Sequence, residues 1–270
     1  MKGAENRQNK TEKIFNEASQ EERLPEDYIA GRNAVSEALR SGRAIDKVLV
    51  AKGERTGSIV MLLAQCREKN VPVKEVDIRR LDSLAGRNHQ GIIAVAACKE
   101  YASVDDIFDA AQKKGEPPFI IVCDELEDPH NLGAIVRTAD AAGAHGVIIP
   151  KRRSAGLTSA VYKASAGAVE YVPVARVSNI SDVLRELKKR GVWIYGLDMQ
   201  GEAWCTADLK GAAAIVVGSE GRGVGRLVRE QCDFILSLPM LGNVSSLNAS
   251  VACGILLYEV ARQRHGLVSR

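Results

Sequence analysis

The stretch Phe119-Ile120-Ile121-Val122-Cys123 is followed closely by Asn131-Leu132-Gly133-Ala134-Ile135-Val136-Arg137. The first is an unbroken apolar run of strand length, and the second carries apolar residues at helical spacing. Apolar strands that alternate with helices are typical of parallel sheets whose two faces are both covered. We therefore predict that the second half of the chain is an α/β domain built on a parallel sheet.

The same alternation continues along the rest of the chain. We predict further strands over 146–149, 169–174, 192–197, 212–217 and 234–238, and further helices near 157–164 and over 180–190 and 246–262. In such sheets ligands bind beyond the carboxyl ends of the strands. Three segments lie at or just after these ends, namely 131–137, 217–223 and 238–250.

The first segment reads as the start of a helix. Asp128, Pro129 and Asn131 are residues suited to a helix N-terminus. Arg137 falls off the apolar stripe of this helix, and Asp140 lies one turn away as an ion-pair partner. A surface ion pair and a functional arginine both remain open at this position.

The second segment places Glu220 in a turn with four glycines, Gly218, Gly221, Gly223 and Gly225. Glycine lets a ligand approach the main chain closely. The spacing fits neither the dinucleotide fingerprint nor the phosphate loop. A tight loop and a ligand site are both consistent with this turn, and a carboxylate within it can orient a donor or a ribose hydroxyl.

The third segment contains Ser245 and Ser246, either of which can cap the following helix. That helix begins with small residues, which permit close packing of another backbone: Ala249, Ser250, Ala252 and Gly254. A plain helix start and a functional Asn248 are both possible interpretations.

Together, the three segments resemble the signature motifs of the SpoU (TrmH) class of RNA ribose 2'-O-methyltransferases. The family pattern Asn-x-Gly-x-x-x-Arg is matched at Asn131, Gly133 and Arg137, and 238–252 resembles the last motif. The resemblance extends from about residue 28 to residue 262. In the first half, 31–35 and 88–92 look like the small substrate-binding domain of the subgroup that methylates a guanosine of 23S ribosomal RNA.

The resemblance implies S-adenosylmethionine as the cofactor, a homodimer, and a deep trefoil knot in the C-terminal domain. The cofactor would contact the backbone at Gly218, Leu238 and Leu247. The reacting centre would be lined by Asn131, Arg137, Glu220, Ser246 and Asn248. The implied reaction is 2'-O-methylation of a 23S ribosomal RNA guanosine during ribosome maturation.

Arg137 could act as a general base or as a phosphate clamp. The arginine of this family is often assigned as a general base, yet a guanidinium in a protein keeps its proton. We therefore hypothesise that Arg137 clamps a neighbouring phosphate and stabilises the developing alkoxide.

Two groups of basic residues are candidates for contacts with the RNA backbone. Lys151, Arg152 and Arg153 follow the predicted strand 146–149, and the second group is Arg222, Arg226 and Arg229. Either group could instead be a solvated charge cluster. Beside a site that acts on RNA, we predict that the first group binds RNA, with salt-sensitive affinity.

We predict four parts of the chain: a mobile tail over 1–24, an RNA-binding α/β domain over 25–100, a linker over 101–118, and the knotted methyltransferase domain over 119–264. The first domain should contain a helix from Asn33, a helix over 58–69, and strands over 47–50, 71–76 and 91–96. A short helix over 104–112 would form part of the linker. This domain resembles ribosomal-protein-like RNA binders.

Composition sets further bounds. At 270 residues and 46% hydrophobic content the chain can bury a sizeable core, and its net charge of +3 neither demands nor excludes RNA. The six cysteines form no CxxC pair, and the four histidines show no metal-ligand spacing, so we expect no metal site. The chain shows no apolar stretch long enough to span a membrane, so we expect a soluble, cytoplasmic protein.

Several other functions remain open. The RNA could be a transfer RNA or a resistance-conferring ribosomal site instead of a 23S guanosine. A non-catalytic RNA-binding assembly factor could share the fold. A nicotinamide-dependent oxidoreductase is a further alternative, but the sequence lacks the dinucleotide-binding fingerprint of that class. A base-carbon methyltransferase would need a cysteine beside the cofactor, and Cys253 is the nearest one to the motifs.

Overall fold

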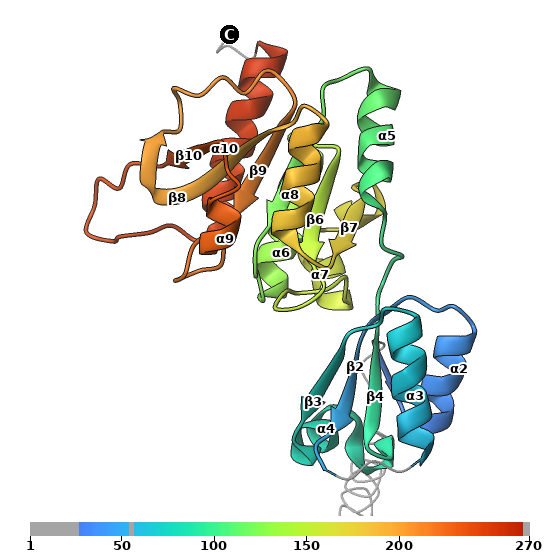
Figure 1. Ribbon diagram of the computed structural model, residues 1–270. Helices are drawn as coiled ribbons and strands as arrows, with labels where there is room; N and C mark the ends of the chain where they lie inside the picture. The colour runs from blue at the N-terminus through green and yellow to red at the C-terminus, as the bar shows by residue number, and fades with distance from the viewer. Residues whose placement is uncertain (1–26, 54–56, 267–270) are drawn as a thin grey trace, which may run out of the picture. The chain divides into compact units, whose positions relative to one another are not determined.

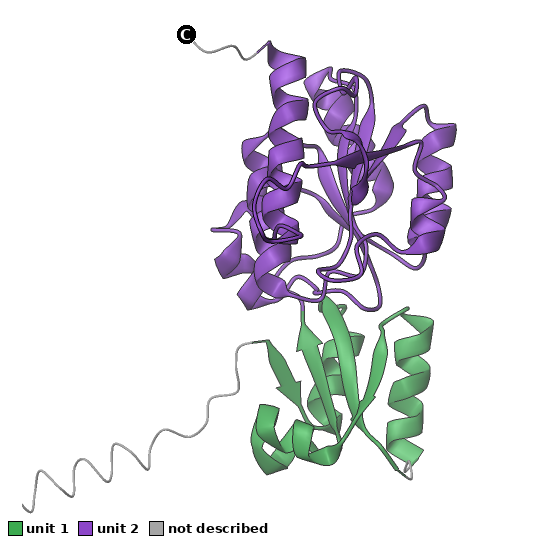
Figure 2. Ribbon diagram, turned by 90° about the vertical axis from the view of Figure 1, so that its left-hand side faces the viewer, with its two compact units in different colours: residues 1–96 green, residues 97–270 purple. Residues whose placement is uncertain are grey.

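The computed structural model describes residues 27–53 and 57–266. The chain divides into two compact units, 1–96 and 97–270, which Figure 2 shows in different colours. The tail expected over 1–24 lies outside the described residues. Among the described residues, no helix is both long and apolar enough to cross a membrane.

Unit 1 is a four-stranded sheet with helices packed against it (Figure 1). Its elements are β1 (Tyr28–Ala30), α2 (Arg32–Arg40), β2 (Ile45–Ala51), α3 (Gly57–Glu68), β3 (Val73–Val76), α4 (Ile78–Ala85), η1 (Gly86–His89) and β4 (Ile92–Ala96). The strand order is β1-β4-β2-β3, in which β4 runs antiparallel to both neighbours and β2 runs parallel to β3. The predicted helices and strands of this half are confirmed, and β1 and α4 add to them.

Unit 2 is a six-stranded sheet with strand order β10-β8-β9-β5-β6-β7, in which all the pairs are parallel. Its elements are α5 (Val104–Lys114), β5 (Phe119–Cys123), α6 (Pro129–Ala141), β6 (Gly146–Pro150), α7 (Ser159–Ala164), η2 (Ala168–Glu170), β7 (Val174–Val177), α8 (Ile180–Lys189), β8 (Trp193–Ala203), β9 (Ala213–Val217), α9 (Arg226–Arg229), β10 (Phe234–Ser237) and α10 (Ala249–His265). The predicted α/β fold with a parallel sheet is confirmed.

The two faces of this sheet carry separate cores. Phe119, Ile121 and Cys123 of β5 pack in the same cluster as buried residues of α6, α7 and α10. Ile120 and Val122 pack in a second cluster with residues of α5, α8 and α9. Alternate residues of a strand point to opposite faces, so an apolar run such as 119–123 is required when both faces are covered.

One predicted strand is wrong. Residues 169–174 do not form a strand, because 168–170 form the short helix η2 and the next strand is β7, Val174–Val177. Val169 and Val172 are buried all the same. The buried apolar residues of this segment were correctly identified as buried. A short buried stretch has the same sequence pattern in a helical turn as in a strand, so the type of element was not determined.

The segment 101–118, predicted as a linker, is part of unit 2. It contains α5, whose N-terminus is held by a capping box between Ser103 and Asp106. Ile107 of α5 is fully buried, and a Cβ on Gly146 would lie only 2.5 Å from its side chain. Because α5 packs directly on β6, this segment belongs to the core of the unit.

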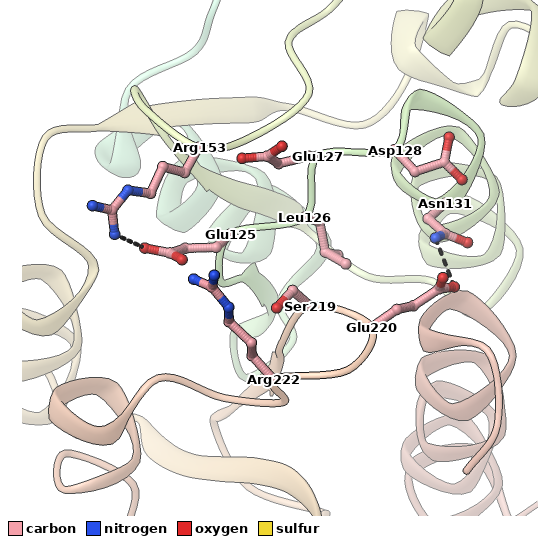
Figure 3. A pocket seen from close by; sticks show the side chains of 9 residues that line it. All are labelled: Glu125, Leu126, Glu127, Asp128, Asn131, Arg153, Ser219, Glu220 and Arg222. Carbon is pink, nitrogen blue, oxygen red and sulfur yellow. Dashed lines mark hydrogen bonds and ion pairs between the residues drawn. The ribbon is translucent and has the colours of Figure 1, made fainter.

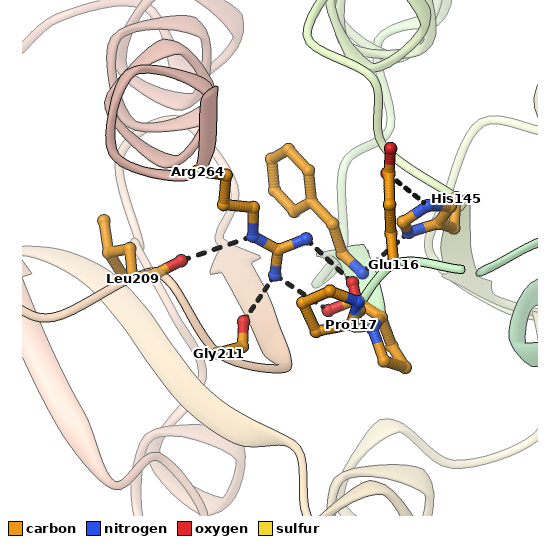
Figure 4. A network of polar contacts seen from close by, with 8 residues as sticks. Glu116, Pro117, His145, Leu209, Gly211 and Arg264 are labelled. Atoms are coloured by element: carbon orange, nitrogen blue, oxygen red, sulfur yellow. Dashed lines mark hydrogen bonds and ion pairs between the residues drawn. The ribbon is translucent and has the colours of Figure 1, made fainter. Parts of the chain in front are cut away.

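The C-terminal helix α10 is fixed by its penultimate residue, Arg264, whose network is drawn in Figure 4. The guanidinium donates to the backbone carbonyls of Leu209, Gly211, Pro117 and Pro118. It also lies over the ring of Phe119, 5.1 Å from the centroid. These bonds join the end of α10 to the start of β5. The predicted trefoil knot stays a prediction.

Candidate active site

The candidate site lies where two neighbouring parallel strands end. Cys123, the last residue of β5, is paired with Val217, the last residue of β9. The segment 124–128 and then α6 follow β5, whereas the glycine-rich loop, which we define as 218–225, follows β9. The parallel register therefore brings both segments to the same edge of the sheet, as the sequence predicts.

Asn131, Glu220 and Asn248 come together at this edge. The Nδ2 of Asn131 donates to Oε1 of Glu220 at 2.9 Å, and Figure 3 shows the two side chains facing each other. The Nδ2 of Asn248 donates to Oδ1 of Asn131 at 2.9 Å and also to Oε1 of Glu220. Three of the predicted site residues thus form one hydrogen-bonded cluster, which we call the amide–carboxylate cluster.

Asn248 is also the N-cap of α10. Its Oδ1 accepts from the backbone N–H groups of Ser250 at 3.0 Å and Val251 at 3.3 Å. The predicted caps, Ser245 and Ser246, are therefore wrong, because Asn248 takes that role. Ser246 is exposed, and within the described part of the chain it contacts no member of the cluster by a hydrogen bond.

The glycine-rich loop is a closed turn. Ser219 and Gly223 exchange two backbone hydrogen bonds, of 3.1 and 2.9 Å. A Cβ on Gly218 would lie 2.0 Å from the carbonyl carbon and oxygen of Gly223, so any side chain at 218 would collide with the backbone. Gly221 and Gly223 have φ of +91° and +64°, which glycine adopts most readily. This geometry explains the glycines and holds Glu220 at the tip of the turn.

The predicted cofactor residues lie on two segments of this edge, with Gly218 in the loop and Leu238 and Leu247 after β10. Gly218 is buried, Leu238 is half-buried, and the Leu247 side chain is 38% exposed. Among the described residues, the segment 238–247 makes no backbone hydrogen bonds. Its amides and carbonyls are therefore free to bind a ligand.

A pocket of about 610 Å³ opens beside the cluster. Its lining, drawn in Figure 3, consists of Glu125, Leu126, Glu127, Asp128, Asn131, Arg153, Ser219, Glu220 and Arg222. Arg153 pairs with Glu125, with an N–O distance of 2.9 Å. Both of these residues have positive φ, +55° and +53°. The pocket thus combines carboxylates with two arginines that can bind a phosphate.

Arg137 lies apart from this group. It is nearly two turns beyond Asn131 on α6, which corresponds to roughly 9 Å of rise and about 120° around the axis. Its side chain is exposed, whereas Asn131 is buried. Within the described residues, the side chain of Arg137 makes no hydrogen bond or ion pair, and the surface pair with Asp140 does not form. A single copy of the chain therefore does not bring Arg137 to the amide–carboxylate cluster.

Each of the two predicted basic groups has one residue that lines the pocket and others that do not. Of Lys151, Arg152 and Arg153, only Arg153 lines the pocket, and Arg152 is exposed. In the second group Arg226 is paired with Glu230 and Arg229 with Asp198, while Arg222 lines the pocket. Arg153 and Arg222 line the pocket, so they are the basic residues best placed at the site, although Arg153 is itself paired with Glu125.

The carboxylates that follow β5 were not among the site residues predicted from the sequence: Asp124, Glu125, Glu127 and Asp128. Their position directly after an apolar strand was the available signal, because that is where such sheets bind ligands. No group of three His, Cys, Asp or Glu side chains able to hold a metal occurs in the described residues.

Comparison with known proteins agrees with this geometry. The model of the SpoU rRNA Methylase family matches residues 118–258, and the model for RNA 2'-O ribose methyltransferase substrate binding matches residues 28–102. A Bacillus subtilis (strain 168) relative, YacO, named as a TrmH family tRNA/rRNA methyltransferase, is 49% identical over 240 residues. That alignment covers 88% of this chain and 96% of YacO.

Solved structures give the same result. The SpoU methyltransferase AviRb from Streptomyces viridochromogenes, in complex with the cofactor AdoMet, has a TM-score of 0.57 and 26% identity, covering 88% of this chain and 90% of that chain. An RNA 2'-O ribose methyltransferase has a TM-score of 0.51 and 30% identity, covering 88% of each chain. With both units matched and Asn131, Glu220 and Asn248 gathered at one edge of the sheet, the chain belongs to the SpoU (TrmH) family of RNA methyltransferases.

Proposed function

We propose that this protein methylates the 2'-hydroxyl of a ribose in RNA, with S-adenosylmethionine as the methyl donor. The observation that carries the proposal is the amide–carboxylate cluster, which joins Asn131, Glu220 and Asn248 beside a pocket with two arginines. The name of one structural neighbour, an RNA 2'-O ribose methyltransferase, supports the ribose as the target.

The backbone near the cluster fits the proposed donor. Among the described residues, the N–H groups of 220–222 and the whole segment 238–247 have no backbone hydrogen-bond partner. Gly218, Leu238 and Leu247 would hold the donor through such main-chain groups, and AviRb is a relative solved with this cofactor. When bound, S-adenosylmethionine supplies an electrophilic methyl group.

The side chains of the cluster would hold the acceptor. Asn131 and Asn248 both donate to Glu220, which fixes the carboxylate at the tip of the loop. The lone pairs of Glu220 that these amides leave free can accept a hydrogen bond from a ribose 2'-hydroxyl. That bond would orient the hydroxyl oxygen. Holding the oxygen at near-attack distance accounts for a large part of such catalysis.

Arg137 would clamp the phosphate next to the reacting ribose and stabilise the developing alkoxide, because a guanidinium keeps its proton. Since one copy does not bring Arg137 to the cluster, we propose a homodimer in which a second copy supplies it. An apolar stripe beside Arg137 supports this: Val251 and Tyr258 of α10 are each 51% exposed. Between them lies Gly254, whose Cβ position is 3.6 Å from Thr138 of α6.

The target that we propose is a guanosine of 23S ribosomal RNA, methylated in the cytoplasm during ribosome maturation. The resemblance of 31–35 and 88–92 to the substrate-binding domain of that subgroup supports it. Transfer RNA is the second candidate, because relatives such as YacO carry a tRNA/rRNA methyltransferase name.

Methylation of a base carbon through a cysteine is disfavoured by the state of Cys253. This thiol is fully buried, and burial raises the pKa of Cys253 to about 12. A protonated, enclosed thiol is a poor nucleophile. The proposal of oxygen methylation therefore accounts better for the residues at the site.

The decisive experiment incubates the protein with methyl-labelled S-adenosylmethionine and unmodified total RNA, and then maps the labelled nucleotide. We expect a 2'-O-methylated guanosine in 23S RNA. Label in transfer RNA would support the second target. RNA binding without incorporation, by protein that binds the donor, would support a non-catalytic assembly factor instead.

A further inference from the structure

Asp124 directly follows β5, and its carboxylate is buried against the glycine-rich loop. The residue is only 6% exposed. Its backbone N–H donates to the carbonyl of Val217 at 2.8 Å, which continues the pairing of β5 with β9. Its Oδ2 accepts from the backbone N–H of Gly225 at 2.8 Å. Asp124 thus joins the end of one strand to the far end of the loop that follows its neighbour.

Glycine at position 225 is part of this contact. A Cβ there would lie 3.0 Å from Oδ2 of Asp124, which is tighter than ordinary van der Waals contact. The backbone of Gly225 has φ −59° and ψ 144°, a conformation open to any residue. A side chain at 225 would therefore push the Asp124 carboxylate away by a few tenths of an ångström, although the dihedral angles of this position suit any residue.

The loop behaves as one piece between two fixed ends. Gly218 continues from β9 and packs against Gly223, which in turn is bonded to Ser219 in both directions. The turn has little freedom to change shape internally. Its placement therefore depends on the bonds of Asn131 and Asn248 to Glu220 at the tip and on its two ends, which are held by β9 on one side and by the contact of Asp124 with Gly225 on the other.

The loop carries the groups that the proposed reaction needs. Glu220 at its tip belongs to the amide–carboxylate cluster. In the part of the chain that the structure describes, the backbone N–H groups of 220–222 have no hydrogen-bond partner and are free to bind a ligand. Groups that bind a ligand without rearrangement give the tightest binding, so a small displacement of the loop should weaken it.

We propose that Asp124 is a positioning residue for S-adenosylmethionine binding, acting through its hydrogen bond to Gly225. This inference rests on the proposed function. Asp124 is only 6% exposed and its Oδ2 is bonded to Gly225, so little of its carboxylate is open to a ligand. Its effect would therefore pass through the loop and not through contact with the ligand.

The cost of keeping a carboxylate at this position supports a specific role. Burial raises the pKa of Asp124, and the neighbouring Glu125 adds to this, while the hydrogen bond from Gly225 lowers it. Burying a carboxylate is costly unless it is hydrogen-bonded, and the bond from Gly225 offsets part of that cost.

The test measures binding of S-adenosylhomocysteine to the full-length protein by titration calorimetry, which needs no RNA and no turnover. Asp124→Leu has the same number and branching of heavy atoms but is bulkier and has no acceptor, so the Gly225 N–H loses its partner. Gly225→Ala disturbs the same contact from the other side. Asp124→Asn keeps an acceptor oxygen, and Gly211→Ala, where a Cβ would meet nothing within 4 Å, is the matched control.

We expect Asp124→Leu and Gly225→Ala to raise Kd about tenfold or more, because each disrupts the hydrogen bond that holds the end of the loop, with the number of sites per folded chain unchanged. Asp124→Asn should stay within about threefold of wild type, and the control should match it. The double variant should bind no more weakly than the weaker single variant, because both substitutions break one contact.

Three results would overturn the inference. The first is an unchanged Kd with fewer binding sites, which means that Asp124 only maintains the fold. The second is an Asp124→Asn variant as weak as Asp124→Leu. The third is strict additivity in the double variant. Failure of the wild-type protein itself to bind S-adenosylhomocysteine would instead contradict the proposed function, so the two failures are distinguishable.

Discussion

Asn131 and Glu220 lie 89 positions apart in the sequence, yet the amide of one donates to the carboxylate of the other at 2.9 Å. The bond is possible because β5 and β9 are neighbours in the sheet and end side by side. Asn248, 117 positions from Asn131, completes the cluster from the start of α10. The amide–carboxylate cluster therefore consists of three segments that only the tertiary structure brings together.

Glu220→Ala should abolish most methyl transfer while leaving the fold intact. The substitution removes the acceptor of Asn131 and Asn248 and the group that would orient the ribose hydroxyl. We expect kcat to fall by about 10² to 10³, as for other preorganised polar groups of active sites. Labelled methyl incorporation measures kcat, and Glu230→Ala, at an exposed paired carboxylate, is the control. A kcat within twofold of wild type in Glu220→Ala would remove this residue from the reacting centre.

Arg137→Lys tests whether the arginine is a clamp or a base. Neither guanidinium nor ammonium titrates near neutral pH, so a clamp predicts lower kcat with an unchanged pH optimum. We expect a loss of about tenfold, because lysine cannot form the bidentate contact with a phosphate. The measurement is kcat as a function of pH. Near-normal turnover with a shifted pH optimum would contradict the clamp.

Arg152 and Arg153 should contribute to RNA affinity through phosphate contacts. In the double alanine variant we expect weaker binding and a salt slope reduced by about 0.7 for each lost contact to single-stranded RNA. Filter binding at several salt concentrations gives both quantities. Arg185→Ala, at an exposed arginine that pairs with Asp182, is the control. Unchanged affinity and slope in the double variant would exclude this patch from the interface.

Glu125→Gln should have the opposite effect on RNA binding in the same assay. Glu125 pairs with Arg153, and neutral glutamine would release that guanidinium for a phosphate. We expect affinity to rise about two- to fivefold, which corresponds to the modest strength of an exposed ion pair.

Gly218→Ala should destabilise unit 2. The added methyl would lie 2.0 Å from the backbone of Gly223, and neither segment can move without breaking the closed turn. Overpacking of this kind costs about 1–3 kcal/mol in the free energy of unfolding. Urea denaturation measures it, and Gly211→Ala should stay within about 0.5 kcal/mol of wild type. Equal stability of both variants would mean that the loop tolerates a side chain.

His145 should make stability fall at acidic pH. Its Nδ1 accepts from the backbone N–H of Phe119 at 3.0 Å, and its Nε2 lies 3.2 Å from Glu116. Burial, followed by the charge of Lys114, lowers the pKa of His145 below its usual value. The folded state therefore binds fewer protons than the unfolded state, and stability present above about pH 6.5 is lost as pH falls through the lowered pKa.

In His145→Asn, which keeps an acceptor and does not titrate, this loss of stability should disappear. Denaturation between about pH 7 and pH 5 would show a shallower slope than wild type, by at most about 1.4 kcal/mol per pH unit. The exposed His265→Asn is the control and should keep the wild-type profile. Identical slopes in wild type and His145→Asn would contradict the prediction.

The sequence by itself determined the alternation of strands and helices in unit 2, because a sheet covered on both faces requires continuous apolar strands such as 119–123. It also determined where ligand-binding residues should lie, since Asn131 and Glu220 follow such strands. Its errors were local. In 169–174 the three valines are buried, whereas Glu170 and Tyr171 are exposed, and burial of apolar residues does not distinguish a helical turn from a strand.

Only the tertiary structure decided which segments meet. The strand order places β9 next to β5, and this neighbourhood brings Glu220 to Asn131 and Asp124 to Gly225. The same packing leaves Arg137 on the outside of α6, although it stands in the same sequence motif as Asn131. Spacing along a chain fixes the face of a helix, whereas contacts between distant segments depend on how the elements pack, and for that reason no local pattern could supply them.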